Sequence, residues 1–88
     1  MAVFTFKTTL EYADGLCDHK RMFDIREKTK HINVGDIIQY IPWYKGKAVK
    51  GHGITEKRFR VIHVDREDPR VMTNFDIFQM EEVEPDFK

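Results

Sequence analysis

The sequence predicts a mainly β protein of the α+β class, in which about five antiparallel strands curl into a small closed or partly open barrel capped by one early helix. Segments with period-two hydrophobic alternation occupy most of the 88 residues, and only one early segment has helical spacing. The regular strand–helix alternation of a doubly wound sheet never develops, so that class is excluded. A barrel also removes the unpaired edges of so small a sheet. The length allows one domain, expected over residues 1–84, with 85–88 as a C-terminal tail.

The N-terminal elements are a strand followed by the helix. Residues 2–7 alternate between β-branched and aromatic positions, which predicts the first strand. Thr8 and Glu11 have the spacing of a capping box. A short helix is therefore expected from about residue 9 to 18, although Gly15 within it lowers helix propensity.

The next strand is expected at residues 22–27, where the alternation is clean. Phe23 and Ile25 share one face, and Asp24 and Arg26 share the other. An acid and a guanidinium therefore lie side by side on one strand.

The middle of the chain predicts a loop, a turn, a strand and a hairpin. Residues 28–33 are polar and loop-like, and residues 34–36 form a tight turn into an apolar strand at 37–41. Pro42 is expected to end that strand or to mark an edge. The glycine-rich segment 45–53 is expected to be a mobile hairpin loop.

The last two strands are expected at residues 55–64 and 71–80, joined by a turn at 66–70. Period two predicts that the first of these two strands presents three residues on one face: Phe59, Val61 and His63.

Composition excludes several classes of protein. No apolar run approaches the roughly 20 residues that a membrane helix needs. The N-terminus lacks the apolar core of a secretory signal, and the single cysteine excludes an internal disulfide framework. A cytoplasmic location is therefore the expectation.

Charge is balanced in total, with 15 basic and 15 acidic residues, but it is segregated along the chain. Residues 45–60 are strongly basic and residues 75–88 are acidic. The basic segment could attract a nucleic-acid backbone, or it could be a solvated hairpin neutralised by its acidic neighbour. The candidate backbone contacts are Lys45, Lys47, Lys50, Lys57 and Arg58.

The usual catalytic and cofactor patterns are missing from the sequence. The four histidines and the cysteine do not have the spacing of a metal site, and neither a phosphate-binding loop nor a nucleophile elbow occurs. No metal ligand, cofactor or catalytic residue is therefore expected.

Two groups of residues fit ligand binding. Asp24 can accept from an amino group, and Arg26 can donate a planar fork to a phosphate or a base edge; the alternative is a surface ion pair of little energetic value. Trp43 and Tyr44 adjoin the basic segment and are candidates for base stacking, with core or hairpin packing as the alternative.

The run at residues 19–26, followed by Val-Gly-Asp and two isoleucines at 34–38, resembles the ASCH domain of the PUA-like superfamily. It is most similar to short bacterial and phage ASCH-like proteins described as RNA-binding, and the likeness covers residues 10–38. The resemblance implies a cleft between the helix and a PUA-like barrel. Arg26 would match the motif arginine, Asp24 its acid, and Arg21, or otherwise Lys20, its lysine.

The resemblance implies a small nucleic-acid or nucleotide binding module, with RNA favoured as the partner. Some ASCH proteins are amidohydrolases that use a lysine and a threonine at the positions that resemble Arg21 and Asp24 here. Because arginine does not readily deprotonate, hydrolysis of a modified nucleoside is the first alternative rather than the main expectation. A protein-interaction or inhibitor protein, with an apolar patch at Trp43 and Tyr44, is the second.

Overall fold

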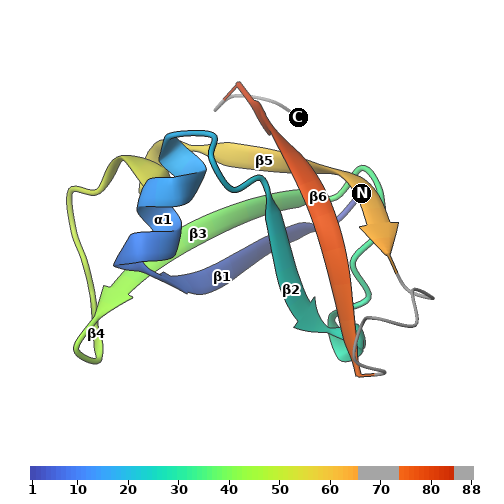
Figure 1. Ribbon diagram of the computed structural model, residues 1–88, viewed down its shortest axis with the longest axis horizontal. Coiled ribbons are helices and arrows are strands. Elements are labelled where there is room, and N and C mark those ends of the chain that lie inside the picture. The colour runs from blue at the N-terminus through green and yellow to red at the C-terminus, as the bar shows by residue number, and fades with distance from the viewer. Residues whose placement is uncertain (66–73, 85–88) are drawn as a thin grey trace.

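The computed structural model describes residues 1–65 and 74–84, which form a mainly β protein with one α-helix (Figure 1). In chain order the elements are β1 (Val3–Thr9), α1 (Leu10–Cys17), β2 (Phe23–Glu27), the 3₁₀ helix η1 (Lys28–Lys30), β3 (Ile37–Tyr44), β4 (Lys47–Ala48), the 3₁₀ helix η2 (Gly53–Glu56), β5 (Arg58–Asp65) and β6 (Phe75–Val83).

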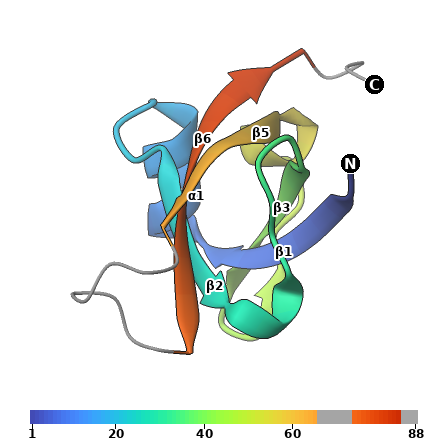
Figure 2. The same cartoon turned by 90° about the vertical axis from the view of Figure 1, so that its right-hand side faces the viewer.

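The strands form one curled sheet in the order β1-β3-β5-β6-β2, and the short β4 pairs with β3 alongside this path. Seen along the long axis, the strands curl around a common centre as a half-barrel (Figure 2). This confirms a curled, mainly β architecture. The expectation that all strands are antiparallel is wrong, because β1 pairs with β3 in parallel from Val3↔Ile37 to Thr9↔Trp43. The chain passes through α1 and β2 before β3 returns beside β1, and such a crossover makes parallel pairing possible.

The helix begins one residue later than the predicted capping box. Thr9, not Thr8, is the N-cap, because its side chain accepts a hydrogen bond from the Tyr12 backbone N–H. Thr9 is the last residue of β1 and is still extended, which leaves its hydroxyl free to cap the first turn. Ala13 and Leu16 bury the inner side of α1 against β1, β3 and η2.

Pro42 does not end the third strand, which continues to Tyr44. The Pro42 carbonyl accepts a hydrogen bond from Val49 N at 2.8 Å. The nitrogen and carbonyl of one strand residue point to the same side, so the missing N–H of Pro42 faces the hairpin. The parallel pairing with β1 therefore loses no donor.

The segment after β3 is a tight turn rather than an open loop. Lys45 and Gly46 both have positive φ angles, of 50° and 79°, as a two-residue hairpin turn requires. His52 then ties the segment to α1: its Nδ1 accepts from Ile54 N, and its Nε2 lies 2.8 Å from Asp14 Oδ1.

A β-bulge between Val61 and His63 changes the faces predicted for β5. Phe59 and Val61 are buried as expected, but His63 is exposed and contacts Asp65, and the next residue inward is Val64. The extra residue of a bulge shifts the alternation beyond it. The predicted turn at 66–70 and the first residues of the predicted strand 71–80 lie outside the described residues.

One hydrophobic core serves the described residues. It extends from β1 and α1 to β5 and β6 and includes Ile32, which lies in the segment that the sequence indicated as a polar loop. The fully or nearly fully buried members are Phe6, Ala13, Leu16, Ile32, Ile38, Tyr40, Ile54, Phe59, Val61, Phe78 and Met80.

Candidate functional site

Asp24 and Arg26 face the inside of the half-barrel, and the apolar residues between and beside them face out. Asp24 is buried, whereas Phe23 and Ile25 are exposed. Asp24 Oδ2 accepts hydrogen bonds from Tyr40 Oη at 2.8 Å and Arg26 Nε at 3.0 Å, and Oδ1 accepts from Ile25 N at 2.8 Å. The carboxylate therefore fixes the positions of the Ile25 N–H, the Arg26 guanidinium and the Tyr40 hydroxyl.

Arg26 connects the two ends of the curled sheet. Strands β1 and β2 are the terminal strands in the sheet order. From β2, Arg26 Nη2 donates to the Lys7 carbonyl oxygen of β1 at 3.0 Å, and the guanidinium lies 4.3 Å from the centre of the Phe6 ring. We call this Asp24–Arg26–Lys7 connection the seam. It occupies backbone groups at edges that would otherwise be open to intermolecular pairing.

Tyr12 and Arg21 extend the seam towards α1. The Arg21 guanidinium lies 5.2 Å from the centre of the Tyr12 ring. Burial raises the pKa of Tyr12 well above its usual value, and the negative charge of Asp24 raises it further, while Arg21 and Arg26 act in the opposite direction. The Tyr12 hydroxyl is buried and lies close enough to the Asp24 carboxylate to interact with it. Lys20 is exposed, and its backbone N–H bonds to α1.

Trp43 lies on the outer face of the β1–β3 pair, opposite to the face that carries the seam, and beside a cavity of about 330 Å³. The ammonium of Lys7 rests 4.2 Å from the centre of the Trp43 ring. The ammonium of Lys45 lies 5.4 Å from the centre of the exposed Tyr44 ring. We call this cavity the outer groove, and it is lined by Lys7, Thr8, Thr9, Trp43, Lys45 and Gly46.

The basic segment divides into two parts in the structure. Lys57 pairs with Glu82, and Arg60 pairs with Glu81, so the acidic end of β6 neutralises these cations. Arg58 is half-buried on β5. The remaining lysines of the segment are exposed: Lys45, Lys47 and Lys50.

Glu82 contacts both Lys57 and His19. Burial opposes its ionisation, but hydrogen bonds from His19 and Lys57 outweigh burial and lower the pKa of Glu82. Its Oε1 lies 2.8 Å from His19 Nε2, so the residues that follow α1 are held against β6.

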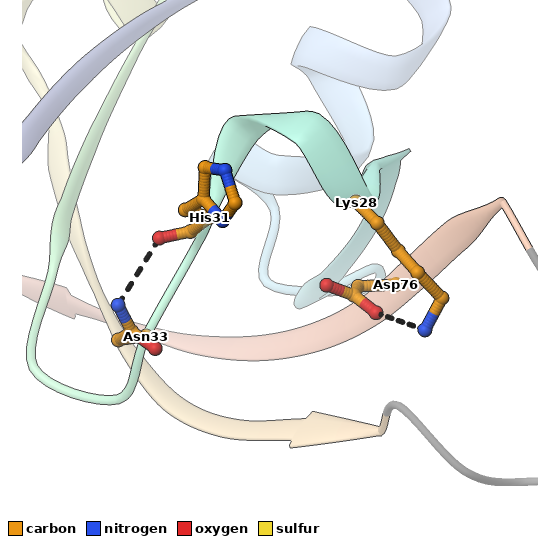
Figure 3. A pocket seen from close by; sticks show the side chains of 4 residues that line it. All are labelled: Lys28, His31, Asn33 and Asp76. Atoms are coloured by element: carbon orange, nitrogen blue, oxygen red, sulfur yellow. Dashed lines mark hydrogen bonds and ion pairs between the residues drawn. The ribbon is translucent and has the colours of Figure 1, made fainter.

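A second cavity, of about 320 Å³, opens near η1 (Figure 3). Its lining includes the ion pair between Lys28 and the buried Asp76, whose atoms Nζ and Oδ1 are 2.9 Å apart. Asn33 donates to the His31 carbonyl across the other side (Figure 3). The sequence did not single out this cavity, because its residues come from two segments separated by more than 40 positions.

Asp36 is the structural residue that the sequence analysis missed. It is buried, and its two oxygens accept from Ala2 N at 2.9 Å and from Asn33 N at 2.8 Å. Gly35 before it has a φ of +96°, which favours glycine. The Gly-Asp pair in the turn was the available signal, but the contact with Ala2 could not be read from its spacing.

The described residues place no group of three or more histidine, cysteine, aspartate or glutamate side chains where they could hold a metal ion. Burial raises the pKa of the Cys17 thiol, which disfavours the thiolate that a nucleophile needs. Over the same residues, no helix is both long and apolar enough to cross a membrane.

The arrangement as a whole combines arginine and lysine side chains with aromatic rings on both faces of β1, and it suits the binding of an anionic, planar ligand. No protein-family model and no curated protein sequence matches the chain.

Proposed function

We propose that the chain is a small RNA- or nucleotide-binding module with an ASCH-like, PUA-like barrel. The curled sheet with one early helix supports this proposal, as does the inward placement of Asp24 and Arg26 beside α1. RNA is favoured because aromatic rings next to cations are the usual means of holding unpaired bases and their phosphates.

The observation that carries the proposal is the environment of the Arg26 guanidinium. Asp24 and the Lys7 carbonyl engage one N–H on Nε and one on Nη2, which orients the planar group. An arginine has five N–H donors, and within the described part of the chain no further partner engages the others. The side chain is 24% exposed. A pre-oriented fork with unused donors suits a phosphate or a base edge.

Arg21 provides the second cation of this site. It is exposed, and both it and Arg26 lie close enough to Tyr12 to influence the ionisation of its hydroxyl. The buried Tyr12 hydroxyl is a further polar group at the same place. Asp24 has most of its accepting capacity committed to its neighbours, so we assign it to orienting Arg26 rather than to reading an amino group.

Fluorescence anisotropy with labelled single-stranded RNA at low salt tests the proposal. Arg21→Gln is expected to weaken binding, and Lys30→Gln, which removes a cation from η1, is the matched control. Affinity should also fall steeply as salt is raised, because neutralising phosphates releases counterions. The proposal fails if RNA and nucleotides do not bind at low salt, or if the two variants have equal effects.

A protein-binding role is the second candidate, favoured by the outer face of β2 and β5. Phe23, Ile25 and Ile62 are 42%, 48% and 46% exposed and lie on this face. The predicted apolar patch at Trp43 and Tyr44 is a separate surface, where Tyr44 is 54% exposed. If this face binds a second copy of the chain, sedimentation velocity should show a mass that rises with concentration and returns to the monomer value in Ile25→Ser.

A further inference from the structure

The outer groove lies on the side of β1 that faces away from the seam. Phe6 is buried inside the half-barrel, and Lys7, the next residue, projects to the outer face. Trp43 stands beside it because Thr9 and Trp43 are partners in the β1–β3 register. The lining of the groove contains two lysines and no acidic residue.

The two lysines of the outer groove have aromatic rather than carboxylate neighbours. Lys7 rests on Trp43, and Lys45 rests on Tyr44. Within residues 1–65 and 74–84, neither lysine forms an ion pair, in contrast to Lys57, which Glu82 neutralises. The positive charge of the groove is therefore available to an incoming anion.

The Trp43 ring can exchange the Lys7 ammonium for a stacked base. Its indole N–H is buried and donates no hydrogen bond among the described residues, so packing and the Lys7 ammonium set the position of the ring. A nucleic-acid base stacks on tryptophan more strongly than an exposed ammonium does. An approaching phosphate would draw Lys7 off the ring and expose its face for stacking.

The groove is connected to the seam through one residue. The Lys7 carbonyl accepts from Arg26 on the seam side, whereas the Lys7 ammonium lies on Trp43 on the groove side. A single RNA strand that passes over the free edge of β1 would contact the Arg26 guanidinium on one side and the Lys7 ammonium on the other.

We propose that the outer groove is a second subsite for single-stranded RNA, in which Lys7 and Lys45 bind the phosphate, and Trp43 stacks the base, of the nucleotide that flanks the one at Arg26. This inference rests on the proposed function. It predicts that oligonucleotides use the groove and that a mononucleotide held at Arg26 does not need it.

Intrinsic fluorescence provides a direct test, because Trp43 is the only tryptophan of the chain. Uridine monophosphate and uridylate oligomers of increasing length are titrated into the wild type, Lys7→Gln, Lys45→Gln and the control Lys30→Gln. Lys7 and Lys45 are exposed, and unchanged thermal unfolding would confirm that their variants fold.

The expected result is that oligomers, but not the monophosphate, quench Trp43. Lys7→Gln and Lys45→Gln should each lower the slope of log affinity against log salt for the oligomers by ~0.7, with no change for the monophosphate. If oligomers bind but leave Trp43 unquenched, or if both variants match Lys30→Gln, the second subsite is refuted while the proposed function stands. If neither ligand binds at low salt, both proposals fall.

Discussion

Replacing Arg26 with glutamine tests whether the seam holds the half-barrel closed. The change removes the Nε contact with the Asp24 carboxylate, the Nη2 contact with the Lys7 carbonyl and the contact with the Phe6 ring. A hydrogen bond to a charged group contributes about 1.5–3 kcal/mol, and one to a neutral group contributes about 0.5–1.5 kcal/mol.

Those contributions must be reduced, because water can replace part of what a 24% exposed side chain loses. We therefore expect Arg26→Gln to lower the free energy of unfolding by about 2 kcal/mol. For a chain of this size that corresponds to a Tm lower by roughly 8–16 °C. Urea and thermal unfolding followed by circular dichroism measure both quantities.

The control is Arg21→Gln, which removes a guanidinium that rests on Tyr12 but forms no hydrogen bond within the described residues. Its effect should stay within about 0.5 kcal/mol. A double-mutant cycle of Asp24→Asn with Arg26→Gln should show a coupling free energy of at least about 1 kcal/mol. Equal Tm values for the two arginine variants, or an additive double-mutant cycle, would refute the conclusion that the seam stabilises the fold.

Three further predictions concern stability. Burial, and then the charge of Asp24, raises the pKa of Tyr40 above its usual value, so the folded protein retains a proton that the unfolded chain releases above about pH 10. The free energy of unfolding should fall as pH rises beyond that point, by up to about 1.4 kcal/mol per pH unit from this residue, and urea unfolding between pH 9 and 11 should give a flatter dependence in Tyr40→Phe; parallel curves would contradict the assignment. Asp36→Ala removes the acceptor of Ala2 N and should cost about 2 kcal/mol, with faster amide exchange at the N-terminal end of β1, whereas unchanged exchange there would show that the contact is dispensable. The lowered pKa of Glu82 means that its stabilising contribution is present above about pH 4.5 and is lost as pH falls through its folded pKa. The stability of Glu82→Gln should therefore depend less on acid than that of the wild type, by at most about 1 kcal/mol because the pair with Lys57 is partly exposed. Identical acid-unfolding curves for the two proteins would contradict this prediction.

Local periodicity was sufficient to identify most elements and their faces. The alternation at residues 22–27 correctly separated Asp24 and Arg26 from Phe23 and Ile25, because successive side chains of a regular strand point to opposite faces. The alternation in β1 likewise placed its aromatic residues on one face, and Phe6 on that face is buried. Helical spacing located α1 to within a residue at either end.

Strand partners, register and the choice of which strand face points into the core depend on contacts between distant segments. Local reasoning was insufficient for these three properties. The bulge in β5 and the continuation of β3 through Pro42 follow from what lies on each side of those strands. Hydrophobicity alone would have turned Ile25 inward. The core instead takes up Asp24, because Tyr40 and Arg26 satisfy its carboxylate, and burial of a charge is tolerated when it is paired and hydrogen-bonded.

Residue types indicated Asp24, Arg26 and Trp43 as candidates but did not indicate Lys7 or Tyr12, and they gave no geometry. Arginines, lysines and aromatic residues indicated an anionic ligand wherever they lay in the chain. That Lys7 joins Trp43 on one face while its carbonyl meets Arg26 on the other follows from the parallel register of β1 with β3 and from the curl that brings β1 near β2. Those relations join residues 19 and 36 positions apart, and nothing in the local sequence encodes a distance between them.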